Sequence, residues 1–326
     1  MQILVTGITG RIGANLAADL LKRGHQVRGL VWERDERVAK LKDLEVELEY
    51  GTITSADDAL RATDGVDAVY HLAAAFQGGG PFSDEEYFEI NVRGTFNMLE
   101  AARAHGRVRH FIHASTDAVY GGHRVDQSGG ELIREDDAPR RPASWYALSK
   151  HLAEEVCHGY HRIHSFPVTM MRFAWAHAAD EILRQPYFSL SRMKQRYPEL
   201  EQVWDGDERL VLLRDQEGKS YKAHMVDVRD LVHGLVCALD KPEAFGQVFN
   251  LAAPTAFTWE EVVPHLSQAL EIPWVEASLS GAGIHYQLDI SKAQKTIGYK
   301  PKYDMLRMID DGLAFQRGED IGILPT

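Results

Sequence analysis

The sequence predicts an α/β protein built on a doubly wound parallel sheet, with a smaller C-terminal lobe. In the first third of the chain, short apolar runs alternate with amphipathic stretches at helical spacing. This order is typical of a parallel sheet covered by helices on both faces. Beyond Gly121 the order stops, and segments rich in Gly, Pro, charge and scattered aromatic residues follow. We therefore expect one sheet domain and a second unit assembled from later segments.

The individual elements follow from apolar periodicity and from end signals. Expected strands lie at residues 3–5, 27–32, 46–50, 66–72, 109–114, 168–173 and 247–251. Expected helices lie at 11–23, around 38–44, from 55, at 84–105, 145–164 and 228–239, from 258, and at 305–315. Gly24 ends the first helix, and Ser55 is the expected N-cap of the third. Residues 121–144 are expected to form a long surface loop, and residues 176–221 irregular structure.

Composition and charge exclude several classes of protein. The chain has 326 residues, with 36 Lys and Arg against 48 Asp and Glu, a net charge of −12. This acidic balance argues against nucleic acid or an anionic membrane as the main partner. The two cysteines are too few for a disulfide scaffold. Neither a signal-peptide pattern nor a membrane-spanning apolar run is present, so we expect a cytoplasmic protein.

Three glycines, Gly7, Gly10 and Gly13, lie between the first strand and the first helix. Small residues there let the backbone turn tightly and let a pyrophosphate approach the helix N-terminus, which attracts anions. This context predicts dinucleotide binding. Glu33 could hold the ribose diol of NAD, and Arg34 the extra phosphate of NADP, although two solvated charges would give the same pattern. The choice between the two cofactors stays open.

Tyr146 and Lys150 are four residues apart, on one face of the expected helix 145–164. A phenol is a poor acid or base near neutral pH, and a nearby cation favours its ionised form. Ser115 and Thr116 follow a strand that ends on the side of the sheet where ligands bind. A hydroxyl at this point can hydrogen-bond a reacting oxygen, so these residues together predict acid–base chemistry.

Five motifs occur in order between residues 6 and 150. They are Thr6-Gly7-x-x-Gly10-x-x-Gly13, His71-Leu-Ala-Ala74, Asn91-Val-Arg-Gly-Thr95, Ser115-Thr-Asp-Ala-Val-Tyr-Gly121 and Tyr146-x-x-x-Lys150. Together they resemble the extended short-chain dehydrogenase/reductase family, in its NAD-dependent epimerase/dehydratase group. The resemblance implies a Rossmann-type domain, which we assign to residues 1–174 and 226–256. Residues 175–225 and 257–326 would form the substrate-binding lobe.

The resemblance also implies a role for each matched residue. Thr116 would position the substrate oxygen, and Tyr146 would exchange its proton. Lys150 would tune Tyr146 and bind the nicotinamide ribose, while Asn91 would support the lysine and its proton relay. The implied cofactor-binding residues are Gly7, Thr9, Gly10, Arg11, Ile12, Gly13, Glu33, Arg34, Thr52, Ile53, Leu72, Ala73, Ala74, Tyr146, Lys150 and Phe173. Candidate substrate contacts are Ser115, Asp117, Trp175, His177 and His224.

Four departures from the family pattern narrow the substrate. Ala118 occupies the place of the Glu that dehydratases use in eliminating water. Trp175 and Ala223 replace an Asn and an Arg that would contact a diphosphate, and charged contacts of that kind are strong. Thr52 replaces an Asp that would meet the adenine. These changes favour a substrate smaller than a nucleotide sugar.

Other features point to structure rather than chemistry. His158, His161 and His164 drift around one helix, so a surface or dimer-face cluster is expected and no metal site. Residues 76–82 contain three consecutive glycines and are expected to form a loop over the cofactor cleft. The family also implies a homodimer through helices around residues 96–104 and 152–160.

These observations lead to one main hypothesis and two alternatives. The main hypothesis is an NAD- or NADP-dependent oxidoreductase or epimerase that transfers a hydride at a secondary hydroxyl or ketone of a sugar-like small molecule. One alternative is a nucleotide-sugar epimerase. The other, from a different class, is a cofactor-sensing or protein-binding module without catalysis. Relatives of that kind commonly lose the Tyr or the Lys, whereas this chain keeps both.

Overall fold

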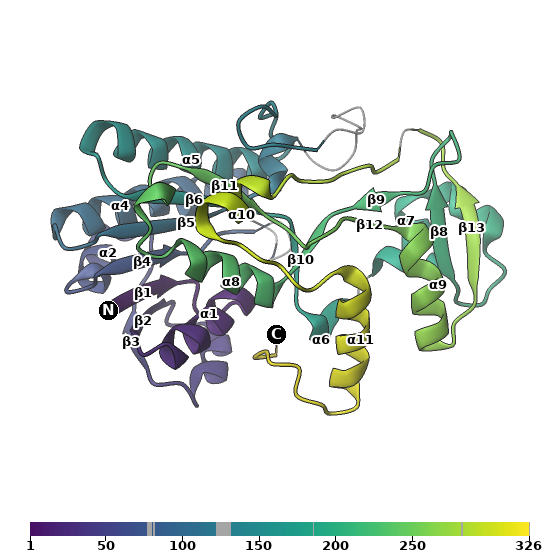
Figure 1. The fold of residues 1–326 in the computed structure, drawn as a ribbon, viewed down its shortest axis with the longest axis horizontal. Helices are drawn as coiled ribbons and strands as arrows, with labels where there is room; N and C mark the ends of the chain where they lie inside the picture. Colours follow the sequence, from purple (N-terminus) through teal and green to yellow (C-terminus); the bar gives the residue numbers. More distant parts are fainter. Residues whose placement is uncertain (77–79, 81, 122–131, 185, 282, 326) are drawn as a thin grey trace.

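A seven-stranded parallel sheet forms the larger part of the structure, a computed structural model that describes residues 1–76, 80, 82–121, 132–184, 186–281 and 283–325 (Figure 1). Its strand order is β11-β6-β5-β4-β1-β2-β3. The strands are β1 (Gln2–Thr6), β2 (Gln26–Val31), β3 (Val46–Tyr50), β4 (Ala68–His71), β5 (His110–Thr116), β6 (Val168–Phe173) and β11 (Val248–Leu251). This is the order of a doubly wound sheet, so the predicted fold class is confirmed.

Helices cover both faces of the sheet, and each face has its own apolar core (Figure 1). One face carries α1 (Arg11–Lys22) and α8 (Val228–Ala238). The other carries α2 (Ala56–Thr63), α4 (Gly94–Ala104) and α5 (Trp145–His164). Buried Leu16 and Leu20 of α1 belong to the first core, and buried Met98 of α4 and Cys157 of α5 to the second.

Several helix boundaries follow the predicted end signals. The Ser55 hydroxyl accepts a hydrogen bond from the backbone of α2, and Thr258 with Glu261 forms a capping box at α9 (Trp259–Leu270). The expected helix 84–105 is instead α3 (Asp84–Tyr87), a π-helical turn η2 (Phe88–Arg93) and α4. The charged segment after β2 forms a 3₁₀ turn, η1 (Glu36–Leu41), rather than an α-helix.

The second unit is built from later segments around two small sheets. β8 (Leu210–Arg214) pairs with β13 (Trp274–Ser278), and β9 (Lys222–Ala223) with β12 (Phe257–Thr258). The expectation that residues 176–221 are irregular was wrong. They contain most of β7 (Trp175–His177), as well as α6 (Ala179–Ile182), η4 (Pro186–Phe188), α7 (Leu190–Arg196), η5 (Pro198–Val203) and β8. Each of these elements is too short to show a clear apolar period.

The two units meet where the carboxyl ends of the sheet strands face the second unit (Figure 1). β7 pairs in parallel with β10 (Met225–Asp227), and α11 (Met305–Gln316) packs on α6. A Cβ at Gly312 of α11 would lie 2.8 Å from the Ala179 carbonyl oxygen, so glycine allows this close approach. The remaining elements are η3 (Asp117–Tyr120), η6 (Pro242–Ala244) and α10 (Ser291–Ile297).

Two expectations fall partly outside the described residues, namely the loop at 121–144 and the loop at 76–82. Within the described part of the chain, no helix is both long enough and apolar enough to cross a bilayer.

Candidate active site

The glycine-rich segment forms a tight turn from β1 into α1. Gly7 has a φ of +70°, and a Cβ there would lie 2.7 Å from the Ala73 backbone nitrogen. A Cβ at Gly13 would lie 2.2 Å from the Gly7 carbonyl oxygen, whereas at Gly10 the nearest contact would be 3.3 Å. Gly10 is the N-cap of α1 and provides no side-chain cap, so the first N–H groups of the helix can bind an anion. The turn therefore fits a dinucleotide pyrophosphate.

We expect Gly13→Ala to weaken NAD binding by about tenfold, because its methyl group would collide with backbone atoms that cannot move aside. Titration of reduced cofactor by fluorescence measures the affinity. The matched control is Gly159→Ala in α5, where a Cβ meets no atom within 4 Å. The control should bind NAD normally, and unchanged affinity in both variants would contradict the role assigned to the turn.

Arg11, the first residue of α1, connects this turn to the second unit. Its guanidinium donates hydrogen bonds to the Ala176 carbonyl oxygen at 2.7 Å and to the Glu181 carboxylate at 2.8 Å. Ile12, the next predicted cofactor residue, is partly buried and packs against the apolar core. Arg11 therefore holds the beginning of the second unit beside the dinucleotide turn.

The charged side chains after β2 are arranged differently from the expectation. Glu33 and Arg34 are exposed. The chain turns back so that Asp35 accepts a hydrogen bond from the Thr9 hydroxyl at 2.6 Å. Hydrogen bonds from Arg37 are the main reason that the pKa of Asp35 falls to about 2. Asp35 thus places a charged carboxylate beside the glycine-rich turn. The sequence did not predict this contact.

The ends of β3 and β4 supply the rest of the predicted cofactor groove. Thr52 donates its backbone N–H to the Asp58 carboxylate at 2.9 Å, and Ile53 is buried. Residues 72–74 follow β4 and are partly buried. His71 lies beneath them, with its ring nitrogens 2.9 Å from the Thr6 hydroxyl and 3.1 Å from the Thr95 hydroxyl. Burial lowers the pKa of His71 to about 3, so this histidine is a neutral structural link.

Tyr146 and Lys150 lie in the first two turns of α5, which Ser144 caps. Tyr146 is partly exposed, whereas Lys150 is only 3% exposed. Burial lowers the pKa of Lys150 to about 8. Its ammonium makes no hydrogen bond or ion pair to any residue that the structure describes. Because a buried cation without partners is costly, this site fits a ligand with hydroxyl acceptors, such as a ribose.

Thr116 and Asp117 lie at the end of β5, beside Tyr146. Burial raises the pKa of Tyr146 to about 12, hydrogen bonding with Thr116 lowers it, and the charge of Asp117 adds to the rise. The Thr116 hydroxyl also donates to the Asp117 carboxylate at 3.2 Å. Phe173, paired with Thr116 across the sheet, is buried. Tyr286 of the second unit donates its phenol proton to the same carboxylate.

Asn91 braces the helix that carries Tyr146 and Lys150. Its side chain accepts from the Ala75 backbone N–H at 2.8 Å and donates to the Ala75 carbonyl oxygen at 2.9 Å. It also donates to the Ser149 hydroxyl at 2.9 Å, and Ser149 donates to the Tyr146 carbonyl oxygen. The side chain of Asn91 therefore fixes the first turns of α5.

Two predicted substrate residues lie together at the entry to the second unit. The Trp175 ring stacks on Tyr187 with centroids 5.3 Å apart, and His177 meets the same ring edge-on at 5.8 Å. The His177 ring also lies 3.4 Å from the Glu181 carboxylate. Ser115 and Asp117 are buried at the end of β5.

His224, another predicted substrate residue, is used by the fold. It is 1% exposed, and its Nε2 lies 3.0 Å from the Ala253 carbonyl oxygen. Its Nδ1 accepts the Leu288 backbone N–H at 3.2 Å. A substrate contact would have to break one of these two bonds.

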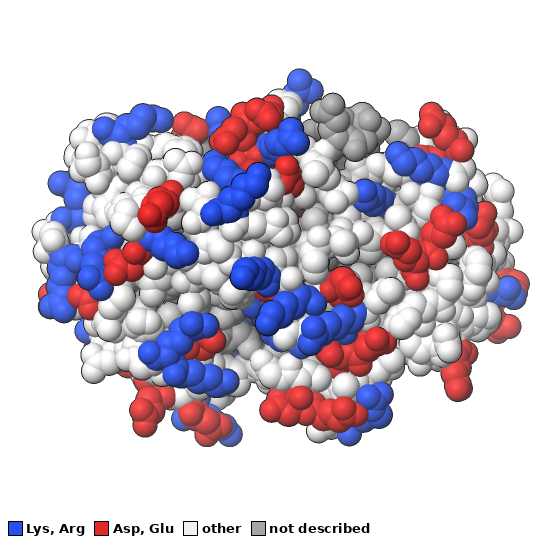
Figure 2. Space-filling view, in the orientation of Figure 1, with Lys and Arg blue, Asp and Glu red and all other residues white. Residues whose placement is uncertain are grey.

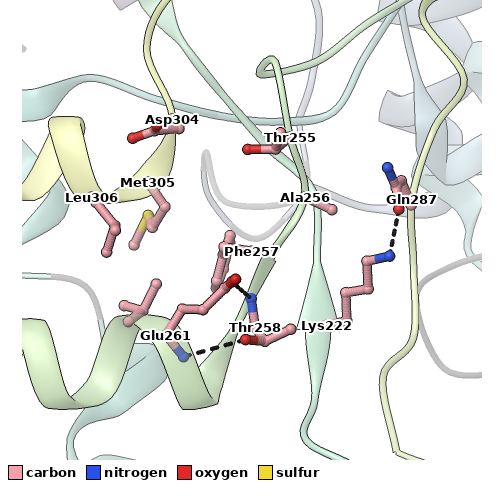
Figure 3. A pocket seen from close by; sticks show the side chains of 11 residues that line it. Lys222, Thr255, Ala256, Phe257, Thr258, Glu261, Gln287, Asp304, Met305 and Leu306 are labelled. Carbon is pink, nitrogen blue, oxygen red and sulfur yellow. Dashed lines mark hydrogen bonds between the residues drawn. The ribbon is translucent and has the colours of Figure 1, made fainter.

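A surface cavity of about 480 Å³ lies in the second unit (Figure 3). Its lining includes Gln287, Lys222 and the beginnings of α9 and α11. The Lys222 ammonium donates to the Gln287 side chain. No predicted catalytic residue lines this cavity, so it is separate from the candidate active site. Among the described residues, no group of three or more His, Cys, Asp or Glu could hold a metal ion.

Comparison with known proteins decides the family. The model of the NAD dependent epimerase/dehydratase family matches residues 3–252. The chain belongs to this family. The expected family and cofactor class are therefore confirmed, and the chain is an enzyme of the extended short-chain dehydrogenase/reductase type.

Three known proteins are similar to this chain over almost its whole length. A short-chain dehydrogenase/reductase superfamily protein from Agrobacterium tumefaciens, solved with bound NAD, is 30% identical, with 98% of each chain covered and a TM-score of 0.84. A protein described as an uncharacterized UDP-glucose epimerase from Bacillus subtilis is 26% identical, over 97% of this chain and 98% of its own length. A 3 beta-hydroxysteroid dehydrogenase/Delta 5-->4-isomerase from Mycobacterium tuberculosis is 27% identical, over 96% and 90%.

Proposed function

We propose that this protein transfers a hydride between NAD and a secondary hydroxyl or ketone carbon of a sugar-type small molecule. The observation that supports it most is the convergence of Thr116, Tyr146 and Lys150 at the end of β5 and the beginning of α5. Bound NAD supplies the hydride acceptor. The chain supplies the proton chemistry and the positioning.

In this proposal each of the three residues has a separate task. Tyr146 takes the proton of the substrate hydroxyl, and Thr116 hydrogen-bonds the same oxygen. Lys150, whose pKa is lowered by burial to about 8, keeps its positive charge below that pH and favours the phenolate. Above that pH, Lys150 loses its positive charge. The catalytic advantage of Lys150 is thus greatest at neutral pH.

Two features favour NAD over NADP as the cofactor. The Asp35 carboxylate is charged at neutral pH and contacts the glycine-rich turn through the Thr9 hydroxyl. A negative charge there repels a 2′-phosphate and suits a ribose diol. In addition, Arg37 is paired with Asp35 rather than turned toward a ligand.

The substrate lobe favours a substrate smaller than a nucleotide sugar. Trp175 occupies the position at which the family pattern has an Asn that would contact a diphosphate. Its ring stacks on the ring of Tyr187. Ala223 is buried in β9, while neighbouring Lys222 lies in the separate cavity of Figure 3. Asp117 is present, but Ala118 occupies the place of the Glu that dehydratases use in eliminating water. A nucleotide-sugar epimerase remains the second candidate, supported by the similar Bacillus subtilis protein.

The proposal also covers the location of the enzyme, its oligomeric state and the kind of partner that it binds. We propose a cytoplasmic homodimer formed through α4 and α5, where Phe96 is 45% and Ile163 is 75% exposed. Residues 175–225 and 257–326 would form the substrate lobe. On the face shown in Figure 2, Lys and Arg lie interspersed with Asp and Glu, and the net charge is −12, a distribution suited to a small-molecule partner.

The test begins with the purified protein and the identity of any nicotinamide dinucleotide that it carries. Free D-glucuronate, D-glucose, UDP-glucose and a 3β-hydroxysteroid are then supplied with NAD or NADP, while nicotinamide absorbance and sugar NMR are followed. We expect turnover with a free sugar and NAD. A cofactor that stays bound and unchanged, with a product inverted in configuration at one carbon, indicates an epimerase. Reduction of one cofactor molecule per product molecule indicates a dehydrogenase. If none of the compounds reacts, the proposal fails and the cofactor-sensing alternative gains support.

A further inference from the structure

The carboxylate of Asp117 accepts hydrogen bonds from hydroxyls of both units. One donor is Thr116, at 3.2 Å, which is long for an O–H···O bond and therefore weak. The phenol of Tyr286 also donates to this carboxylate, and it reaches Asp117 from a segment 169 residues away. Both Asp117 and Tyr286 are buried, at 3% and 5% exposure. Asp117 is thus a fixed charge beside the reacting groups.

Tyr286 is held as a permanent proton donor. Its backbone N–H donates to the Lys222 carbonyl oxygen at 3.0 Å, and Lys222 in turn donates to the Ile284 carbonyl oxygen at 2.7 Å. Burial, together with the charge of Asp117, raises the pKa of Tyr286 well above its ordinary value. The phenol therefore keeps its proton at neutral pH.

Thr116 has a single hydroxyl proton and two possible acceptors. It can donate to Asp117, or it can donate to the Tyr146 oxygen, where it stabilises the phenolate. A carboxylate that loses one of its donors holds the remaining protons more strongly, because hydrogen bonds to charged acceptors are about twice as strong as neutral ones. The Tyr286 phenol satisfies Asp117 and weakens this competition.

We propose that Tyr286 is a positioning residue: its phenol donates to Asp117 and thereby frees the Thr116 proton for the oxygens that react at Tyr146. The inference rests on the proposed function and deepens it, since it assigns a residue of the second unit to the acid–base chemistry. The phenol of Tyr87 from α3 also faces Tyr146, and Lys150 lies one turn further along the same helix. Removing the Tyr286 phenol changes neither of them.

The test measures the ionisation of Tyr146 directly and needs no substrate. In protein labelled with [¹³Cζ]tyrosine and saturated with NAD, the Tyr146 resonance is the one that is lost in Tyr146→Phe, and its chemical shift is followed with pH. We expect Tyr286→Phe to raise the midpoint by about one pH unit, which is about tenfold less phenolate at a given pH. In Tyr286→Phe, Asp117→Asn should bring the midpoint back down, because the neutral amide competes less for the Thr116 proton.

The matched control is Tyr299→Phe, since Tyr299 is another buried phenol and donates to the Ala252 carbonyl oxygen at 2.8 Å, away from Thr116. It should lower thermal stability about as much as Tyr286→Phe and leave the Tyr146 midpoint unchanged. An equal midpoint in Tyr286→Phe and the unmodified protein overturns the inference. So does a Tyr146 signal that never titrates in the unmodified protein, or an equal shift in the control. Lack of turnover with every sugar would instead count against the proposed function alone.

Discussion

Replacing Tyr146 with phenylalanine is expected to lower turnover by about 10²–10⁴-fold and to leave the affinity for NAD unchanged. The substitution keeps the aromatic ring and the helix but removes the group that exchanges a proton with the substrate. Lys150 lies one turn further along α5 and keeps its buried position, so the expected ribose contact is preserved. Nicotinamide absorbance measures turnover, and quenching of protein fluorescence measures NAD affinity.

The matched control for this experiment is Tyr87→Phe. The Tyr87 ring lies 6.2 Å from the Tyr146 ring, so the control removes a phenol from the same part of the site. We expect it to change turnover only a few-fold. Full turnover by Tyr146→Phe would remove the acid–base role from Tyr146. Equal losses in both variants would show that the shape of this region matters more than the phenolic proton.

Features encoded within a few residues were predictable from the sequence. The helix α5 has the predicted bounds because its N-cap, Ser144, and its apolar period lie in one continuous stretch. The same holds for the turn at Gly7 and Gly13, where the strand, the small residues and the helix follow one another directly. In both cases the physical cause of the structure is local.

Contacts between distant segments had no signal in the sequence. Arg11 meets Glu181 over 170 positions, and Tyr286 meets Asp117 over 169. Nothing in the neighbourhood of any of these residues indicates its partner, because the partner is set by how the second unit docks on the sheet. These long-range contacts are nevertheless the ones that join the second unit to the cofactor turn and to the reacting groups.

The contact between Asp35 and Thr9 was not predicted because the end of β2 was placed one residue too late. The prediction extended β2 to Trp32 and took the next two charged residues as the cofactor contacts. The strand ends one residue earlier, and the Asp35 N–H then bonds back to the Trp32 carbonyl oxygen at 2.9 Å. This turn directs the third charged residue, not the first or second, toward Thr9. An error of one residue at a strand end is enough to change which side chain contacts the glycine-rich turn.

The second large effect concerns the buried ion pair between Glu154 of α5 and Arg172 of β6, both of which are fully buried. The guanidinium donates two hydrogen bonds to the carboxylate, at 2.9 and 2.7 Å, and a third to the Tyr120 phenol at 2.8 Å. Glu154→Gln leaves the positive charge without its counter-ion. We expect the free energy of unfolding to fall by about 3–5 kcal/mol at neutral pH, as measured by urea denaturation.

The controls for this prediction separate burial from charge pairing. Glu89→Gln breaks an exposed pair with Arg93, and we expect a change within about 0.5 kcal/mol. Glu154→Leu combined with Arg172→Met removes both buried charges and should recover most of the stability lost in Glu154→Gln. If Glu154→Gln alone is as stable as the unmodified protein, Arg172 has another counter-ion.

The pH dependence of the same pair gives an independent check and connects it to the active site. Burial opposes ionisation of Glu154, but the bonds from Arg172 outweigh it and hold the pKa of Glu154 below its ordinary value. The stabilisation is therefore complete above the ordinary carboxyl range and is lost as the pH falls through the lowered pKa, so the difference between Glu154→Gln and the unmodified protein should shrink on acidification. Burial lowers the pKa of Lys150, and the charge of Glu154 partly offsets that shift. Removing the carboxylate should thus lower the stability of the fold and lower the pKa of Lys150 further.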